Sequence, residues 1–232
     1  MGAVLLTFLL CAGLAETVKA SPIPLKKSRS APAGERDCVI LIHGLGRTPL
    51  SMKRLEWTLA RAGYQVVNLR YPSRSFPVER LAEEYLDKAV AAQSPAGRIH
   101  FVTHSLGGIV LRQYLARHTM TNPGRVVMLA PPNHGSALAG RLKKSAVGRW
   151  ILGPAGCELG PGASELPERL GPAHFQLGVI AAANDGKVSV QSARLDGMAD
   201  FLVVPGTHTW IMWRADTSRQ VLAFLQDGQF TR

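Results

Sequence analysis

Short, largely apolar runs that alternate with amphipathic stretches constrain the fold of this chain more than any other feature. The first run, residues 38–42, reads Cys-Val-Ile-Leu-Ile and contains no charged side chain. Such runs are typical of strands that are buried on both faces, as in a parallel sheet covered by helices. Similar runs follow at residues 66–69, 99–103, 126–129, 177–183 and 201–204. We therefore predict six strands.

Helical periodicity appears between these runs. Residues 78–92 place Leu81, Tyr85, Leu86 and Ala89 on one face of a predicted helix. Further helices are predicted at residues 51–62, 109–117 and 217–226. This alternation predicts an α/β fold, with a mostly parallel six-stranded sheet and helices on both of its faces.

The alternation stops at residues 133–174, where no strand is predicted and Gly and Pro are frequent. We interpret this segment as a cap inserted into one domain that spans residues 38–232. Apolar residues recur there at every fourth position: Leu138, Leu142, Ala146 and Trp150. They predict one amphipathic helix over residues 135–153 whose apolar stripe covers a cleft. The alternative is a helix that rests on an anionic lipid interface, and a mobile lid would do both in turn.

The first residues have the pattern of a targeting segment. Residues 4–15 form an apolar run with the length of a signal-peptide core, and Val18 and Ala20 suit a cleavage site. We predict a signal peptide over residues 1–20 and an exported protein, periplasmic or secreted. No Lys or Arg precedes Val4, so an uncleaved membrane anchor is the alternative. Residues 21–37 are rich in proline and basic side chains and are predicted to be a flexible linker.

Charge and cysteine content set weaker limits. The chain has 27 Lys and Arg against 16 Asp and Glu, a net charge of +11. This excess favours anionic partners such as a membrane or lipid interface. The chain carries no nucleic-acid-binding motif, so we do not expect nucleic acid as a partner. Cys38 lies in an apolar run and is expected to be a buried small side chain rather than the disulfide partner of Cys157.

Ser105 lies at a corner between a predicted strand and a predicted helix. The segment reads Ile-His-Phe-Val-Thr-His-Ser-Leu-Gly-Gly-Ile-Val over residues 99–110. A serine at such a corner is held in a strained backbone conformation, with its hydroxyl exposed above the sheet at a helix N-terminus. A tight turn without chemistry is the alternative. The strand before it and the helix after it favour a nucleophile.

This segment resembles the nucleophile turn of the α/β-hydrolase family, and within it of the small bacterial lipases and esterases. The family pattern is Gly-x-Ser-x-Gly, and this sequence has Thr-His-Ser-Leu-Gly at residues 103–107. Thr103 replaces the first glycine, and we expect this bulkier residue to open the turn slightly. The resemblance covers residues 38–226 and specifies a fold rather than a substrate.

The resemblance also implies an oxyanion hole. His43-Gly44-Leu45-Gly46 directly follows the first strand, where the family places one backbone donor, and the second donor follows the nucleophile. Carried across, these donors are the N–H groups of Leu45 and Leu106. His43 is expected to shape this loop rather than to act as a base.

The base is sought among seven histidines: His43, His100, His104, His118, His134, His174 and His208. The family order is nucleophile, acid, then base, and His208 follows the last predicted strand. His134 is the rival, but it precedes any plausible acid. We expect it to line the substrate pocket together with His43 and His104.

Asp185 is the predicted acid because it directly follows the strand at 177–183. Its Asn-Asp-Gly context is also typical of an ordinary turn, so its position decides the assignment. Asp196 and Asp200 are the alternatives.

Ser105, His208 and Asp185 together predict an enzyme that cleaves carboxylic esters, such as lipid esters, through an acyl-enzyme intermediate. An acyltransferase or thioesterase with the same three residues is one alternative. A non-catalytic binding protein on the same fold is another. No metal-ligand spacing, phosphate loop or dinucleotide motif is present, so we expect neither a metal nor a cofactor.

Overall fold

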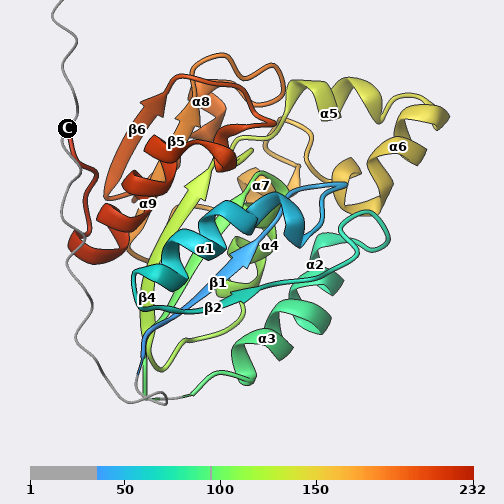
Figure 1. Ribbon diagram of the computed structural model, residues 1–232. Coiled ribbons are helices and arrows are strands. Elements are labelled where there is room, and N and C mark those ends of the chain that lie inside the picture. The colour runs from blue at the N-terminus through green and yellow to red at the C-terminus, as the bar shows by residue number, and fades with distance from the viewer. Residues whose placement is uncertain (1–35, 95) are drawn as a thin grey trace, which may run out of the picture.

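A six-stranded, entirely parallel sheet forms the centre of the molecule (Figure 1). The computed structural model describes residues 36–94 and 96–232; the predicted signal peptide and nearly all of the predicted linker lie outside these residues. In spatial order the strands are β2 (Gln65–Asn68), β1 (Cys38–Ile42), β3 (Ile99–His104), β4 (Pro123–Leu129), β5 (Leu177–Ala182) and β6 (Asp200–Val204). The predicted α/β fold with its six strands is confirmed.

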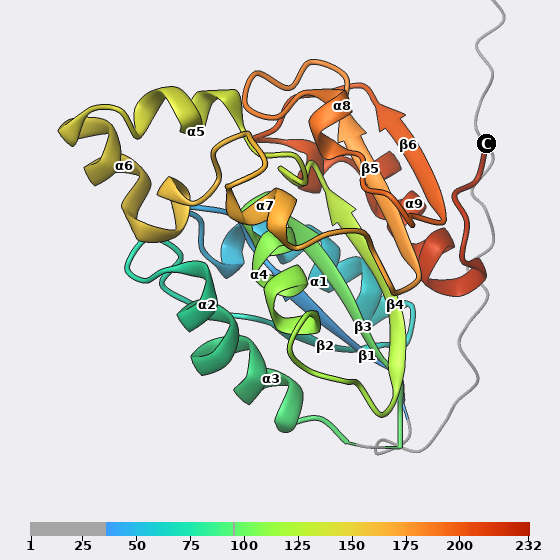
Figure 2. The ribbon, with the colours of Figure 1, turned by 180° about the vertical axis from the view of Figure 1, so that it is seen from behind.

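Helices cover both faces of the sheet because successive strand residues point to opposite sides. Val39 and Leu41 pack with α1 (Lys53–Arg61) and α9 (Ala215–Asp227) on the face seen in Figure 1. Ile40 and Ile42 pack on the other face, which Figure 2 shows, in the cluster that includes α4 (Leu106–Leu115). Both faces of β1 are therefore dry, which explains its uninterrupted apolar sequence.

The remaining helical segments are short. The helix predicted over residues 78–92 consists of α2 (Val78–Leu81), a π-helical stretch η2 (Ala82–Leu86) and α3 (Asp87–Ala91). Two 3-10 turns, η1 (Pro49–Met52) and η3 (Ile211–Trp213), precede α1 and α9, and α8 (Val190–Ala193) lies between β5 and β6.

The cap between β4 and β5 contains α5 (Ala137–Leu142), α6 (Ala146–Cys157) and α7 (Leu166–Arg169). The prediction of one continuous helix over residues 135–153 is wrong. Ser145 ends the continuity because its hydroxyl accepts a hydrogen bond from the N–H of Gly148 and so caps a new helix. A second break follows at Gly153, whose φ of 64° no right-handed helix contains.

The predicted apolar stripe is therefore divided. Leu138 and Leu142 of α5 face a cavity beneath the cap, whereas Trp150 of α6 is 76% exposed.

Cys38 is buried, and both Cys38 and Cys157 are free thiols. In the described part of the chain, no helix is both long enough and apolar enough to cross a membrane.

Candidate active site

Ser105 lies between the end of β3 and the first turn of α4 in a backbone conformation that serine rarely adopts. Its φ is 52° and its ψ is −123°. Such strain persists only where the surrounding structure holds it. Gly107 allows the tight approach of α4 to the sheet, because a Cβ atom there would lie 2.4 Å from the carbonyl oxygen of Ile42. The serine hydroxyl is thereby presented at the carboxyl edge of the sheet.

Thr103 fits this turn because Gly108, which lies next to it in space, has no side chain. The threonine is completely buried, and a Cβ atom built on Gly108 would lie 3.3 Å from its Oγ1 atom. The N–H of Ser105 still donates to the carbonyl of Leu129 across the sheet, at 2.9 Å. The room that threonine needs is thus supplied on the helix side of the turn.

The structure brings Ser105, His208 and Asp185 together from three separate loops. The hydroxyl of Ser105 lies 2.9 Å from Nε2 of His208, and Nδ1 of His208 lies 2.7 Å from Oδ2 of Asp185. All three side chains are almost fully buried. A carboxylate can only accept a hydrogen bond, so Nδ1 carries the proton and Nε2 is free to accept one from the serine.

Asp185 is itself fixed by its own turn. Its second carboxylate oxygen, Oδ1, accepts hydrogen bonds from the N–H groups of Lys187 and Val188, at 2.8 and 2.9 Å. The turn-forming character of Asn-Asp-Gly and the role of its aspartate are therefore compatible. The alternative Asp200 pairs with Arg232 at 2.6 Å instead, and Asp196 is exposed.

Two backbone N–H groups near Ser105 have no acceptor among the residues that the structure describes. Leu106 is the first residue of α4, where a helix leaves the N–H without a partner of its own. Within the described chain the N–H of Leu45 also donates no hydrogen bond, whereas that of Gly46 donates to Oγ of Ser73. Gly44 allows this loop to lie close to the turn at Ser105, because a Cβ atom on Gly44 would lie 3.2 Å from the Cβ atom of Ser105. Both groups are suited to bind an oxyanion.

Residues 39–230 match the sequence model of the alpha/beta hydrolase family. The chain belongs to this family. No curated protein sequence matches it.

Solved structures of lipases and esterases of the α/β-hydrolase superfamily share the fold. A phospholipase from Legionella pneumophila superposes with a TM-score of 0.65 at 20% identity, over 83% of this chain and 60% of that one. A metagenomic carboxyl esterase superposes with a TM-score of 0.63 at 21% identity, over 83% of this chain and 69% of that one. The mature lipase of Bacillus licheniformis superposes with a TM-score of 0.61 at 17% identity, over 79% of this chain and 89% of that one. The chain thus spans about three fifths of the length of the phospholipase.

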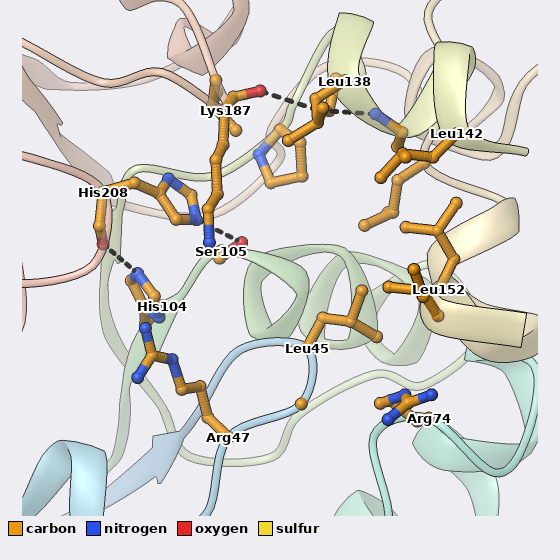
Figure 3. A pocket seen from close by; sticks show the side chains of 17 residues that line it. Leu45, Arg47, Arg74, His104, Ser105, Leu138, Leu142, Leu152, Lys187 and His208 are labelled. Carbon is orange, nitrogen blue, oxygen red and sulfur yellow. Dashed lines mark hydrogen bonds between the residues drawn. The ribbon is translucent and has the colours of Figure 1, made fainter. Parts of the chain in front are cut away.

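A cavity of about 330 Å³ opens above Ser105 in this α/β hydrolase (Figure 3). Most of its wall is apolar and comes from the loop after β1, from the cap and from the loop after β5: Leu45, Leu138, Ala139, Leu142, Ile151, Leu152, Leu159 and Val188. Three basic side chains also line it: Arg47, Arg74 and Lys187. Sequence reasoning missed these three, because they come from three loops that share no motif.

Of the three histidines predicted for the pocket, only His104 lies among the residues that line this cavity. His43 is completely buried and stacks on the ring of Tyr71, with 4.3 Å between ring centroids, consistent with its expected role in the loop. His134 does not reach the cavity because its Nδ1 pairs with Glu168 in the cap, at 2.8 Å. Among the described residues, no cluster of three or more His, Cys, Asp or Glu side chains is arranged to hold a metal ion.

Proposed function

We propose that this protein is a serine hydrolase that cleaves carboxylic esters, with Ser105 as the nucleophile, His208 as the base and Asp185 as the acid. One observation carries the proposal: an unbroken relay runs from the Ser105 hydroxyl through both ring nitrogens of His208 to Asp185, at 2.9 and 2.7 Å. The strained backbone of Ser105 and the free N–H groups beside it add independent support.

The mechanism follows from this geometry. His208 Nε2 takes the proton as Ser105 Oγ attacks the ester carbonyl, and Asp185 stabilises the resulting imidazolium. The N–H groups of Leu45 and Leu106 donate to the oxyanion, and each such donor contributes about 10²–10³-fold in kcat. His208 then gives its proton to the leaving alcohol. Water repeats the attack on the acyl-enzyme and releases the acid.

The apolar wall of the cavity favours an aliphatic acyl group. Leu138, Leu142 and Leu152 face the space next to Ser105 (Figure 3). Burial of each methylene against such a wall contributes about 0.8 kcal/mol. We therefore expect kcat/KM to rise with acyl length until the cavity is filled.

A kinetic series tests this proposal. We expect p-nitrophenyl esters to be hydrolysed with a rapid burst of p-nitrophenol equal to the enzyme concentration when deacylation is slow. Ser105→Ala should abolish both phases, and the exposed Ser75→Ala variant serves as control. Added glycerol distinguishes hydrolysis from acyl transfer by the product formed, and matched thioesters test the thioesterase alternative. A folded protein that binds esters without turning them over would instead be a binding protein.

We further propose that α6 contacts an anionic lipid surface. Val147 and Trp150 are 69% and 76% exposed on this helix, an unusual exposure for large apolar side chains. Arg149 lies between them in sequence, and the guanidinium of Arg74 lies 5.6 Å from the Trp150 ring centroid. Apolar side chains flanked by cations are typical of helices that lie on anionic membranes. Export to the periplasm or the exterior would bring the protein to such surfaces.

A further inference from the structure

Three basic side chains line the cavity, and no acidic side chain does. Arg47, Arg74 and Lys187 form no ion pair among the described residues, and no carboxylate lines the cavity with them. By contrast, Arg117 on the surface pairs with both Glu79 and Glu83. The lining of the cavity therefore carries positive charge and no negative charge, while the carboxylate of Asp185 is engaged by His208 outside the lining.

Arg74 is partly engaged within the protein. Its guanidinium donates to the carbonyl oxygen of Trp150 at 2.8 Å and lies near that residue's ring. The side chains of Arg47 and Lys187 form no hydrogen bond within the described chain. Only their backbone atoms are engaged, Arg47 with Gly44 and Lys187 with Asp185 and Ser136. These two side chains are free to bind a ligand.

Two of the three basic side chains lie on one side of the cavity and most of the apolar wall on the other; Arg74 lies on the apolar side, near Leu152 (Figure 3). Figure 3 shows Arg47 and Lys187 on the side where His104 and His208 lie. Apolar side chains form the opposite side: Leu138, Leu142 and Leu152. Burial lowers the pKa of His104 well below 6.5, and the positive charges of Arg47 and Lys187 lower it further. Both cations therefore act on the immediate surroundings of the nucleophile.

We propose that the substrate is an ester whose alcohol carries an anionic phosphate or carboxylate group, held by Arg47 and Lys187, while its acyl chain lies against the apolar side. This assignment rests on the proposed ester hydrolysis and adds the class of alcohol to it. An ester has one substituent on each side of its carbonyl, and the two sides of the cavity match one apolar and one anionic substituent. Charge-assisted contacts to both cations orient the ester for attack.

Three soluble esters test the inference without any lipid surface: 1-butyrylglycerol, 1-butyrylglycerol 3-phosphate and the butyryl ester of glyceric acid. The acyl group is the same in all three, so differences in kcat/KM report on the alcohol. We expect the wild type to prefer at least one anionic ester over the neutral one by about tenfold, the effect of two charge-assisted contacts. Which anionic ester reacts faster identifies phosphate or carboxylate as the recognised group.

The variants then locate the preference. In Arg47→Gln/Lys187→Gln the ratio of anionic to neutral kcat/KM should fall to about one. Arg219→Gln removes an exposed positive charge on α9, away from the cavity, and should keep the wild-type ratio. Thermal unfolding and turnover of the neutral ester establish that the double variant is folded. Equal kcat/KM for all three esters in the wild type would overturn the inference, as would a preference that survives in the double variant.

A binding measurement separates this inference from the proposed function. Glycerol 3-phosphate and glycerate are titrated calorimetrically into Ser105→Ala, and into the same protein carrying Arg47→Gln/Lys187→Gln. We expect at least one ligand to bind the first protein and neither to bind the second. If no ester is hydrolysed, the proposed function fails, while the calorimetry still decides whether the anion site exists. Absence of binding to Ser105→Ala contradicts the anion site.

Discussion

The ring of His104 donates a hydrogen bond from Nε2 to the backbone carbonyl of His208, at 2.9 Å. The residue that precedes the proposed nucleophile thereby holds the backbone of the proposed base. Both rings are buried, with 5.0 Å between their centroids, and Nδ1 of His104 has no partner among the described residues. This contact joins the end of β3 to the loop after β6, 104 residues further along the chain.

Loss of that contact should affect catalysis more than substrate binding. We expect His104→Phe to lower kcat about tenfold with a smaller change in KM, because the aromatic ring still fills the site but no longer fixes the His208 loop. Steady-state kinetics on a p-nitrophenyl ester measures this division. His174→Phe, at an exposed histidine, is the control. A rise in KM with unchanged kcat would contradict a positioning role for His104.

Buried histidines should make the fold sensitive to acid. Burial lowers the pKa values of His43, His100 and His104 below 6.5 in the folded chain. Their stabilising contribution is complete above pH 6.5 and is lost as the pH falls toward the folded values, because only the unfolded chain then takes up the protons. Each contributes at most about 1.4 kcal/mol per pH unit to the slope of the unfolding free energy.

Urea unfolding between pH 7 and pH 5 tests this dependence. His104→Phe should reduce the slope of unfolding free energy against pH by close to one proton, since burial lowers the pKa of His104 further than those of the other two. His174→Phe should leave the slope as it is in the wild type. An unchanged slope in His104→Phe would mean that His104 is protonated in the folded protein.

Thr103 and Gly108 should be energetically coupled. Gly108→Ala places a Cβ atom 3.3 Å from Thr103 Oγ1, and we expect it to destabilise the wild type by about 1–3 kcal/mol through overpacking. In a Thr103→Gly background the same change should cost less, because the threonine side chain is absent. A double-mutant cycle of urea unfolding measures the coupling. Strict additivity would show that Thr103 does not depend on the space at Gly108.

The exposed face of α6 should matter on lipid aggregates and not in solution. We expect Val147→Ser/Trp150→Ser to lower the ratio of activity on phosphatidylglycerol vesicles to activity on a soluble ester by about tenfold or more, since two large apolar contacts are lost. Leu50→Ser/Trp57→Ser is the matched control, because Leu50 and Trp57 are 69% and 58% exposed elsewhere. Equal ratios in both double variants would contradict a lipid-binding role specific to α6.

The positions of the strands, and of residues that directly follow them, are predicted well from the sequence, because the topology of a parallel sheet determines where they lie. The loops after β3, β5 and β6 open at the same edge of a parallel sheet, so Ser105, Asp185 and His208 are brought together once the strands are recognised. Similarly, the apolar run at Cys38–Ile42 predicts a central strand because both of its faces are covered by helices.

Features that depend on contacts between distant segments were not predictable. His134 follows a strand at the correct edge, yet Glu168, 34 residues later, holds it away from the cavity. The four-residue spacing of the cap suggests one helix, but the Ser145 cap and the positive φ of Gly153 interrupt it. Arg47, Arg74 and Lys187 converge only because three loops meet, and no local pattern relates them.

The central claim, a nucleophile at Ser105, is tested most directly by reaction with a fluorophosphonate followed by intact-mass and peptide mass spectrometry. A second serine, Ser136, also lines the cavity, so the peptide map must distinguish the two. We predict one adduct per chain, located on Ser105, absent from Ser105→Ala and strongly slowed in His208→Ala. A folded wild type that remains unlabelled, or an adduct that persists in Ser105→Ala, would contradict the account.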